Sequence, residues 1–156
     1  MKIATVKNRK LLGTVLVAMQ FACLLLLAAL ALPAATMGNI PPSSVLAGAA
    51  SLALALWILM HNRLGNFNIQ PIPKPQGALV TTGPYRWVRH PMYTALLLGA
   101  AALVPLIGMA FGWGLWCCLA LVLWTKSLFE EQWMQELHPG YRAYMLTSKR
   151  FVPLVF

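Results

Sequence analysis

The chain has 156 residues, of which 60% are hydrophobic and only 10% are charged, and its formal net charge is +9. Soluble domains carry about 25% charged residues, so this composition excludes an ordinary soluble domain and indicates an integral membrane protein. Twelve Lys and Arg against three acidic residues would also suit nucleic-acid binding. The placement of these charges, described below, explains the basicity without a nucleic-acid partner.

An uncharged apolar run over residues 11–32 predicts the first membrane span. A helix of this length reaches about 33 Å, enough to cross a hydrocarbon core of about 30 Å. The run is longer than the apolar core of a cleavable signal peptide, which has roughly 7–15 residues, so we expect a retained anchor. Pro33, Pro41 and Pro42 predict a break in the chain, and residues 43–60 a second span.

Residues 92–125 form another stretch without charge. As a single helix it would be about 51 Å long, which is too long for one crossing. Pro105 and Gly108 near its middle favour a hairpin turn. We therefore predict a third span over residues 92–107 and a fourth over residues 109–127.

Small residues recur on one face of the second and third predicted spans. Ala47, Ser51 and Ala55 are spaced by four residues in the second span, as are Ala95 and Gly99 in the third. Small side chains allow helices to approach closely in lipid. We expect both faces to serve helix packing.

The Lys and Arg residues are confined to three segments, which alternate with segments that carry none. They are Lys2, Lys7, Arg9 and Lys10; Arg63, Lys74, Arg86 and Arg89; Lys126, Arg142, Lys149 and Arg150. Cytoplasmic loops are enriched in Lys and Arg. We therefore expect both termini and the 61–91 loop on the cytoplasmic side of a bacterial inner membrane, and one multi-pass domain over residues 1–156.

The end of the 61–91 loop predicts a short helix followed by a break. Thr82 is a suitable N-cap and Pro84 suits the first turn of a helix that would run through Arg89. His90 precedes a proline, which disfavours helical dihedrals, and Pro91 can open the third span as its first helical residue.

The segment after the fourth span predicts more helix. Phe129, Trp133 and Leu137 recur every four residues, so the fourth helix should continue beyond the membrane. The sequence HPG at 138–140 ends it, and a further short amphipathic helix should begin near Tyr141. We interpret the other polar and aromatic residues of this segment as structural: Glu136, His138, Tyr141 and Tyr144.

Two polar groups of residues should meet at one membrane face. Arg89 and His90 come just before the third span, whereas Glu130 and Glu131 come just after the fourth. Because a helical hairpin returns the chain to the side where it started, we expect these residues in one pocket. The predicted fold is thus an all-α membrane protein with four transmembrane helices and a cytoplasmic cofactor pocket, built from the 61–91 loop and the C-terminal helices.

Such a pocket offers cationic groups, a helix N-terminus, aromatic rings and carboxylates. A ligand with a carboxylate, an aromatic base, an ammonium and a sulfonium matches these features. S-adenosylmethionine is such a ligand, although other zwitterionic nucleotides would also fit.

The stretch LVTTGPYRWVRHPMY, a hydrophobic hairpin, then EE and GYRAYMLTSKRFVP resembles the isoprenylcysteine carboxyl methyltransferase family over roughly residues 65–156. Phospholipid methyltransferases share the Arg-His-Pro, hydrophobic, Glu-Glu pattern. The resemblance implies an S-adenosylmethionine-dependent methyltransferase and a catalytic half over 65–156. It also implies a lipophilic methyl acceptor that enters from the bilayer among membrane lipids.

The resemblance also implies the roles of individual residues. Cofactor contacts would come from Gln70, Leu79, Val80, Tyr85, His90, Pro91, Met92, Tyr93 and Glu130, with Glu131 beside them. Lys126, where an arginine is usual in the prenylcysteine enzymes, would bind the acceptor. Arg89 would brace the pocket or orient an anionic acceptor, and Glu131 could accept a proton from an amine acceptor.

Other interpretations predict different features. A small four-span transporter or a membrane assembly subunit would need no cofactor pocket, and transporters usually place a carboxylate near the midplane. A dinucleotide-dependent membrane reductase would need more spans and phosphate-binding cations. Cys23, Cys117 and Cys118 all lie in predicted spans without zinc-like spacing, so we predict no metal site. The acceptor stays open between a prenylated thiol, a phospholipid amine and a small thiol.

Overall fold

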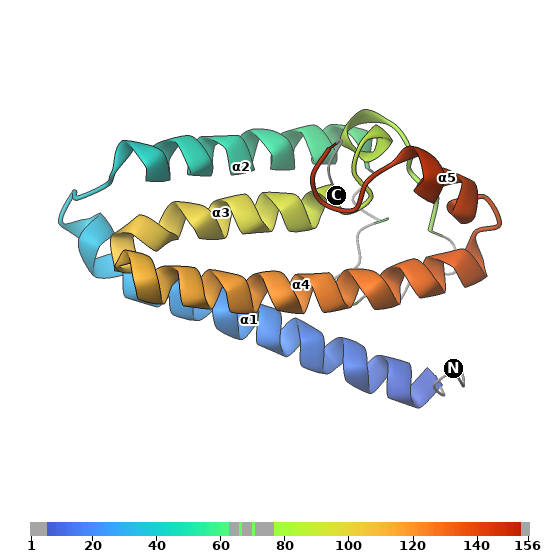
Figure 1. Cartoon of the computed structure of the whole chain (residues 1–156), viewed down its shortest axis with the longest axis horizontal. Helices are drawn as coiled ribbons and strands as arrows, with labels where there is room; N and C mark the ends of the chain where they lie inside the picture. Colours follow the sequence, from blue (N-terminus) through green and yellow to red (C-terminus); the bar gives the residue numbers. More distant parts are fainter. Residues whose placement is uncertain (1–5, 63–65, 67–69, 71–76, 154–156) are drawn as a thin grey trace.

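A computed structural model describes residues 6–62, 66, 70 and 77–153. Within these residues it contains five α-helices and one short 3₁₀ helix (Figure 1). The helices are α1 (Val6–Thr36), α2 (Pro42–His61), η2 (Gly83–Arg86), α3 (Pro91–Ile107), α4 (Met109–Leu137) and α5 (Tyr141–Thr147). The all-α prediction is confirmed, and the Pro-rich part of the 61–91 loop lies largely outside the described residues.

Three of these helices, α1, α2 and α4, are long and apolar enough to cross a membrane. The chain is therefore an integral membrane protein that crosses the bilayer several times. Helix α3 is also apolar but has only 17 residues, about 25 Å of helix. A crossing by α3, the third of the four predicted spans, stays a prediction.

The first helix is longer than predicted at both ends. Pro33 was predicted to break the chain, but it lies inside α1, which continues to Thr36. Proline removes one backbone donor but leaves its own carbonyl available as an acceptor. The amide of Met37 and the hydroxyl of Thr36 both donate to the Pro33 carbonyl, so the last turn keeps its hydrogen bonds.

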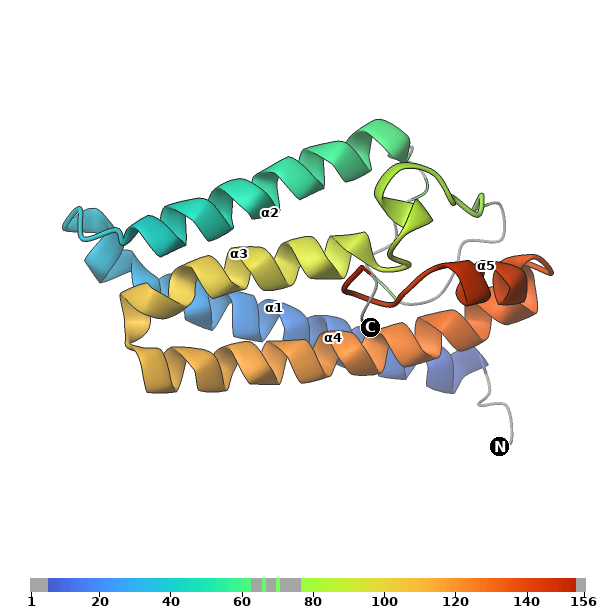
Figure 2. The same ribbon diagram turned by 45° about the horizontal axis from the view of Figure 1, so that its top comes forward.

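Helix α3 lies at the centre of the bundle and contacts α1, α2 and α4 (Figures 1 and 2). The small residues of α2 and α3 face each other, so both faces serve helix packing. A Cβ atom built on Gly99 would lie 3.0 Å from Ser51 Oγ, and this hydroxyl donates to the Ala95 carbonyl at 2.7 Å. The two backbones can approach closely because neither presents a large side chain there.

The predicted hairpin between α3 and α4 turns at a single residue. Gly108 has a φ of +108°, a conformation that favours glycine, and it separates the two helices. A Cβ atom on Gly112 would lie 2.9 Å from the carbonyl oxygen of Val104. The hairpin therefore closes tightly, and the two helices return the chain to the side where α3 began.

The segment between η2 and α3 differs from the predicted helix through Arg89. η2 ends at Arg86, and Thr82 makes no side-chain capping bond. The backbone from Trp87 onward pairs instead with the C-terminal segment: the Lys149 amide donates to the Trp87 carbonyl, and the Arg89 amide donates to the Lys149 carbonyl. These partners satisfy backbone groups that a longer helix would have used.

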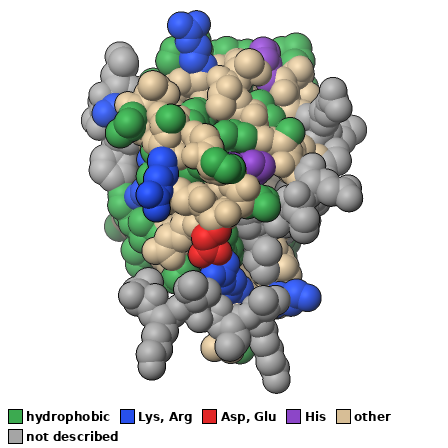
Figure 3. All heavy atoms as spheres, turned by 90° about the vertical axis from the view of Figure 1, so that its right-hand side faces the viewer, with side chains coloured by type: hydrophobic (Ala, Val, Ile, Leu, Met, Phe, Trp, Pro, Cys, Tyr) green, Lys and Arg blue, Asp and Glu red, His purple; other side chains and the backbone are tan. Residues whose placement is uncertain are grey.

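Four helix ends gather at one end of the bundle: the start of α1, the end of α2, the start of α3 and the end of α4 (Figure 2). Figure 3, which looks onto this end, shows Lys and Arg side chains, an acidic side chain and histidine at the surface. Arg9 of α1 forms a bidentate ion pair with Glu136 of α4 here, at 2.7 and 3.0 Å. The predicted continuation of α4 to Leu137, the stop at HPG and the helix α5 are all confirmed.

Candidate active site

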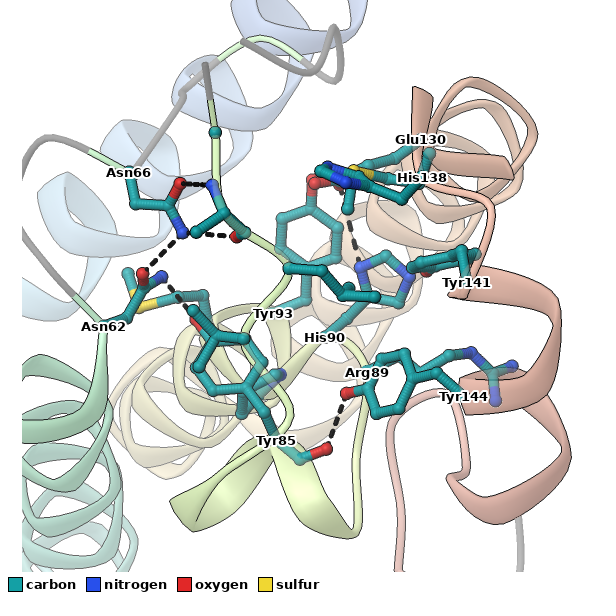
Figure 4. A pocket seen from close by; sticks show the side chains of 17 residues that line it. Asn62, Asn66, Tyr85, Arg89, His90, Tyr93, Glu130, His138, Tyr141 and Tyr144 are labelled. Carbon is teal, nitrogen blue, oxygen red and sulfur yellow. Dashed lines mark hydrogen bonds and ion pairs between the residues drawn. The ribbon is translucent and has the colours of Figure 1, made fainter. Parts of the chain in front are cut away.

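A cavity opens at this end of the bundle between the loop that precedes α3, the end of α4 and α5 (Figure 4). Together with the solvent space at its open mouth, the cavity spans about 890 Å³. The described residues that line it are Asn62, Asn66, Gly77, Ala78, Leu79, Val80, Tyr85, Arg89, His90, Pro91, Met92, Tyr93, Glu130, Met134, His138, Tyr141 and Tyr144.

Tyr93, His90 and Glu130 form one wall of the cavity. Pro91 opens α3, so His90 stands at its N-cap and Tyr93 lies in its first turn. The two rings stack, with centroids 5.2 Å apart and planes inclined by 3°. Tyr93 Oη donates to Glu130 Oε2 at 2.8 Å, and His90 Nδ1 lies 3.7 Å from the same oxygen. The side chain of Glu130 keeps 31% exposure and faces the cavity.

Glu131, the next residue, is engaged on the other side of His90. Its side chain is 3% exposed, and its Oε1 accepts from Arg89 Nε at 2.8 Å and lies 3.2 Å from His90 Nε2. Arg150 donates to Oε1 at 3.1 Å and to Oε2 at 2.6 Å. Both carboxylate oxygens are therefore occupied by fixed cationic groups and the imidazole.

Arg89 is held by groups outside the cavity space. Besides Glu131, its guanidinium donates to the carbonyl of Ser148, and to that of Met145 at 3.4 Å. The side chain is only 9% exposed. These contacts join the loop before α3 to α5 and to the segment after it.

A hydrogen-bonded amide network forms the opposite wall. Asn62 Nδ2 donates to Tyr85 Oη at 3.0 Å, and Asn66 Nδ2 donates to Asn62 Oδ1 at 2.8 Å. The Asn66 side chain also pairs with both backbone groups of Ala78, at 2.9 and 3.0 Å. Since Ala78 leads into Leu79 and Val80, this pairing holds the backbone that lines the cavity (Figure 4).

Three tyrosines outside the spans complete the lining. Burial raises the pKa of Tyr144 to about 12 and raises the pKa values of Tyr85 and Tyr141 above the usual range. Their hydroxyls therefore stay protonated at neutral pH. Tyr144 Oη donates to the Tyr85 carbonyl at 2.5 Å, which ties α5 to η2.

Lys126 is not among the described residues that line the cavity, but it lies close to its wall. The side chain is 1% exposed, within the apolar part of α4. Its ammonium donates to Gln20 Oε1 of α1 at 2.6 Å and stands 5.1 Å from the centroid of the Tyr93 ring. A buried cation in a membrane helix is costly, so such residues usually serve function.

The structure brings most of the predicted site residues together. Those that line the cavity are Leu79, Val80, Tyr85, Arg89, His90, Pro91, Met92, Tyr93 and Glu130. Glu131 and Lys126 contact lining residues instead of the cavity itself. Gln70 does not join the group, because its amide donates to Thr14 of α1 at 3.3 Å.

Sequence reasoning missed several lining residues. Asn62, Asn66 and Met134 were not singled out, and His138, Tyr141 and Tyr144 were interpreted as structural, yet all six line the cavity. The aromatic spacing of α5 could have signalled the tyrosines. The two asparagines carry no sequence signal, because their role depends on distant partners. Asn66 pairs with Ala78, 12 residues further along the chain, and Asn62 pairs with Tyr85, 23 residues further along.

The comparisons with known proteins agree with this site. Residues 43–140 match the family described as phospholipid methyltransferase. No curated protein and no solved structure matches the chain significantly. The matched range begins in α2 and ends just after α4, so it includes both the Arg-His-Pro segment and the paired glutamates. The chain therefore belongs to the phospholipid methyltransferase family, and it is a membrane methyltransferase that uses S-adenosylmethionine to methylate a lipid-type acceptor.

Proposed function

We propose that the cavity is the S-adenosylmethionine site and that it opens to the cytoplasm. The observation that carries this proposal is the convergence of His90, Tyr93 and Glu130 on one cavity, from segments about forty residues apart. In the same proposal α3 also crosses the membrane, as the third of four spans.

The lining residues suit this cofactor chemically. Glu130 supplies a partly exposed carboxylate that can bind an ammonium, and tyrosine rings can stack on a base or contact a cation. The side-chain amides and the backbone of residues 77–80 supply donors and acceptors for a nucleoside.

S-adenosylmethionine, when bound, supplies a methyl group activated by a sulfonium. The residues of the chain then have to position the cofactor, orient the acceptor and exclude water. Glu130 fixes the Tyr93 hydroxyl and Glu131 lies against the His90 ring, so both aromatic side chains are held before any ligand arrives. Arg89 secures the loop on which His90 stands.

Lys126 and Gln20 support an acceptor with an anionic group, such as an isoprenylcysteine carboxylate. Lys126 contacts the Tyr93 ring from within the apolar bundle, on the side from which a lipophilic acceptor would arrive. An amine acceptor is the alternative, and the partly exposed carboxylate of Glu130 would then accept its proton.

The cofactor site is tested by isothermal titration calorimetry of the purified protein in detergent. Glu130→Gln should weaken S-adenosylmethionine binding at least about tenfold, because a charged partner is lost. Glu136→Gln is the matched control, since Glu136 lies on the same helix and pairs with Arg9. Equal affinity for S-adenosylmethionine in the wild type and in Glu130→Gln would contradict the proposed site.

The acceptor is identified by incubation with methyl-labelled cofactor and total membrane lipid, followed by mass spectrometry. A carboxylate acceptor yields a methyl ester, which alkali hydrolyses with loss of label, whereas an amine acceptor keeps its label. Label retained in alkali would contradict the isoprenylcysteine carboxylate and leave an amine or a thiol as the acceptor.

A further inference from the structure

Arg150, in the segment after α5, contacts Glu131 although it does not line the cavity. Its guanidinium meets Glu131 as a fork, with both carboxylate oxygens bonded, and the side chain is 17% exposed. Bidentate pairs of this kind are strong and directional. With Arg89 on the same carboxylate and Glu130 close by, two guanidinium groups and two carboxylates balance in charge.

The same residue also holds the backbone of the Arg-His-Pro segment. The Arg150 carbonyl accepts from the His90 amide at 3.1 Å, while its neighbour Lys149 accepts from the Arg89 amide at 2.7 Å. Arg150 thus fixes His90 twice, through its own carbonyl and through the ring's contact with Glu131.

Arg150 is itself held by packing. Its guanidinium stands 5.0 Å from the centroid of a Trp124 ring. Phe151, which follows, is 8% exposed and packs against the rings of His90 and Tyr93, with centroids 5.9 and 6.3 Å away. The Arg150 side chain therefore rests on Trp124, and the residue that follows it is fixed against the His90 and Tyr93 rings.

This arrangement explains why two neighbouring carboxylates behave differently. Arg150 bonds both oxygens of Glu131 on the inner side of the site, whereas Glu130 lines the cavity and accepts from Tyr93. Without the Arg150 side chain, Glu131 would lose its bidentate partner, and its contact with the His90 ring would depend on Arg89.

We propose that Arg150 is a positioning residue of the cofactor site: it sets the orientation of His90 and Tyr93 through Glu131 and through the backbone of the C-terminal segment. This inference rests on the proposed cofactor site. It predicts that a change at Arg150, which does not line the cavity, alters ligand binding more than it alters folding.

The test compares Arg150→Met, Arg150→Lys and Arg142→Met with the wild type. Methionine keeps an apolar stem beside Trp124 but removes the fork, and Arg142 is an exposed arginine of the same region. Calorimetry should show cofactor affinity reduced about tenfold or more in Arg150→Met and less in Arg150→Lys, with Arg142→Met unchanged. The free energy of unfolding should change much less than the free energy of cofactor binding.

Imidazole NMR without cofactor gives a second readout. The His90 ring signals should move in Arg150→Met and stay in place in Arg142→Met. Wild-type affinity together with unmoved His90 signals in Arg150→Met would overturn the inference. If Arg150→Met does not fold, the same comparison with Arg150→Lys decides. Failure of the wild type to bind S-adenosylmethionine would instead overturn the proposed cofactor site.

Discussion

Glu130 and Glu131 show how strongly the surroundings of a side chain decide its role. The two residues are adjacent on α4 and identical in type, but one is 31% exposed and the other 3%. Glu131 contacts Arg89, Arg150 and His90, and Glu130 accepts from Tyr93. We therefore expect different consequences from the same substitution at the two positions.

Glu131→Gln should destabilise the protein. The substitution leaves two partly buried guanidinium groups without their buried anion, and breaking a buried ion pair costs about 3–5 kcal/mol. Thermal unfolding in detergent measures the effect, and Glu136→Gln, at an exposed ion pair, should cost no more than about 1 kcal/mol. Equal melting temperatures for the two variants would contradict a stabilising role for the contacts of Glu131 with Arg89 and Arg150.

Tyr93→Phe separates the ring from its hydroxyl. The phenylalanine ring keeps the stacking on His90, but Glu130 loses its donor at 2.8 Å. We expect the fold to be retained and S-adenosylmethionine affinity to fall by about tenfold or more, the effect of one hydrogen bond to a charged group. Calorimetry measures the change. Tyr93→Leu, which also removes the ring, should weaken binding further, and equal affinity in both variants would count against stacking.

At the scale of elements, the position of the site depends on the short turn between α3 and α4. The turn at Gly108 and the close approach at Gly112 fix how far along α3 the end of α4 returns. Tyr93 in the first turn of α3 can therefore meet Glu130 near the end of α4. A hairpin that closed less tightly would separate the two halves of the cavity wall.

Gly112→Ala should test this hairpin. The added Cβ would meet the Val104 carbonyl at 2.9 Å, so the backbones must move apart, at about 1–3 kcal/mol. Gly114→Ala is the matched control in the same helix, because its Cβ meets nothing within 4 Å. Thermal unfolding should show a lower melting temperature for Gly112→Ala and an unchanged or higher one for Gly114→Ala. The reverse order would contradict the close contact.

At the scale of the whole molecule, the orientation of the protein in the membrane can be tested with residues at the two ends of the helix bundle. The turn after α1 and the helix α5 lie at opposite ends of the bundle (Figure 1). Met37 in that turn is 75% exposed, and Leu146 in α5 is 88% exposed. The excess of Lys and Arg around α5 predicts that this end faces the cytoplasm.

Cysteine labelling with a membrane-impermeant maleimide measures the orientation. Leu146→Cys should react in inside-out vesicles and Met37→Cys in right-side-out vesicles, in a chain whose Cys23, Cys117 and Cys118 are replaced by Ala. Labelling of both from one side would contradict the three crossings by α2, α3 and α4 that separate the two positions. Labelling with the two sides exchanged would contradict the cytoplasmic cavity.

The sequence by itself determined the helices and the end at which polar residues gather. Apolar runs, the spacing of small residues and the positions of prolines are local, so they predicted α2, the hairpin at Gly108 and the opening of α3 at Pro91. The distribution of charge is also local information, and it placed the Arg-His-Pro segment and the paired glutamates at one face. Pro33 was misjudged because a proline near a helix end costs only one donor.

Only the tertiary structure decided how the site is divided among its residues. The Asn66 pairing with Ala78, the cavity face of Tyr141 and the attachment of Arg150 to Glu131 all join residues that no short-range period relates. The backbone between η2 and α3 could form a helix or pair with the C-terminal segment, and the structure takes the second course. Such choices depend on which partner satisfies a buried polar group, and that partner is known only once the chain has folded.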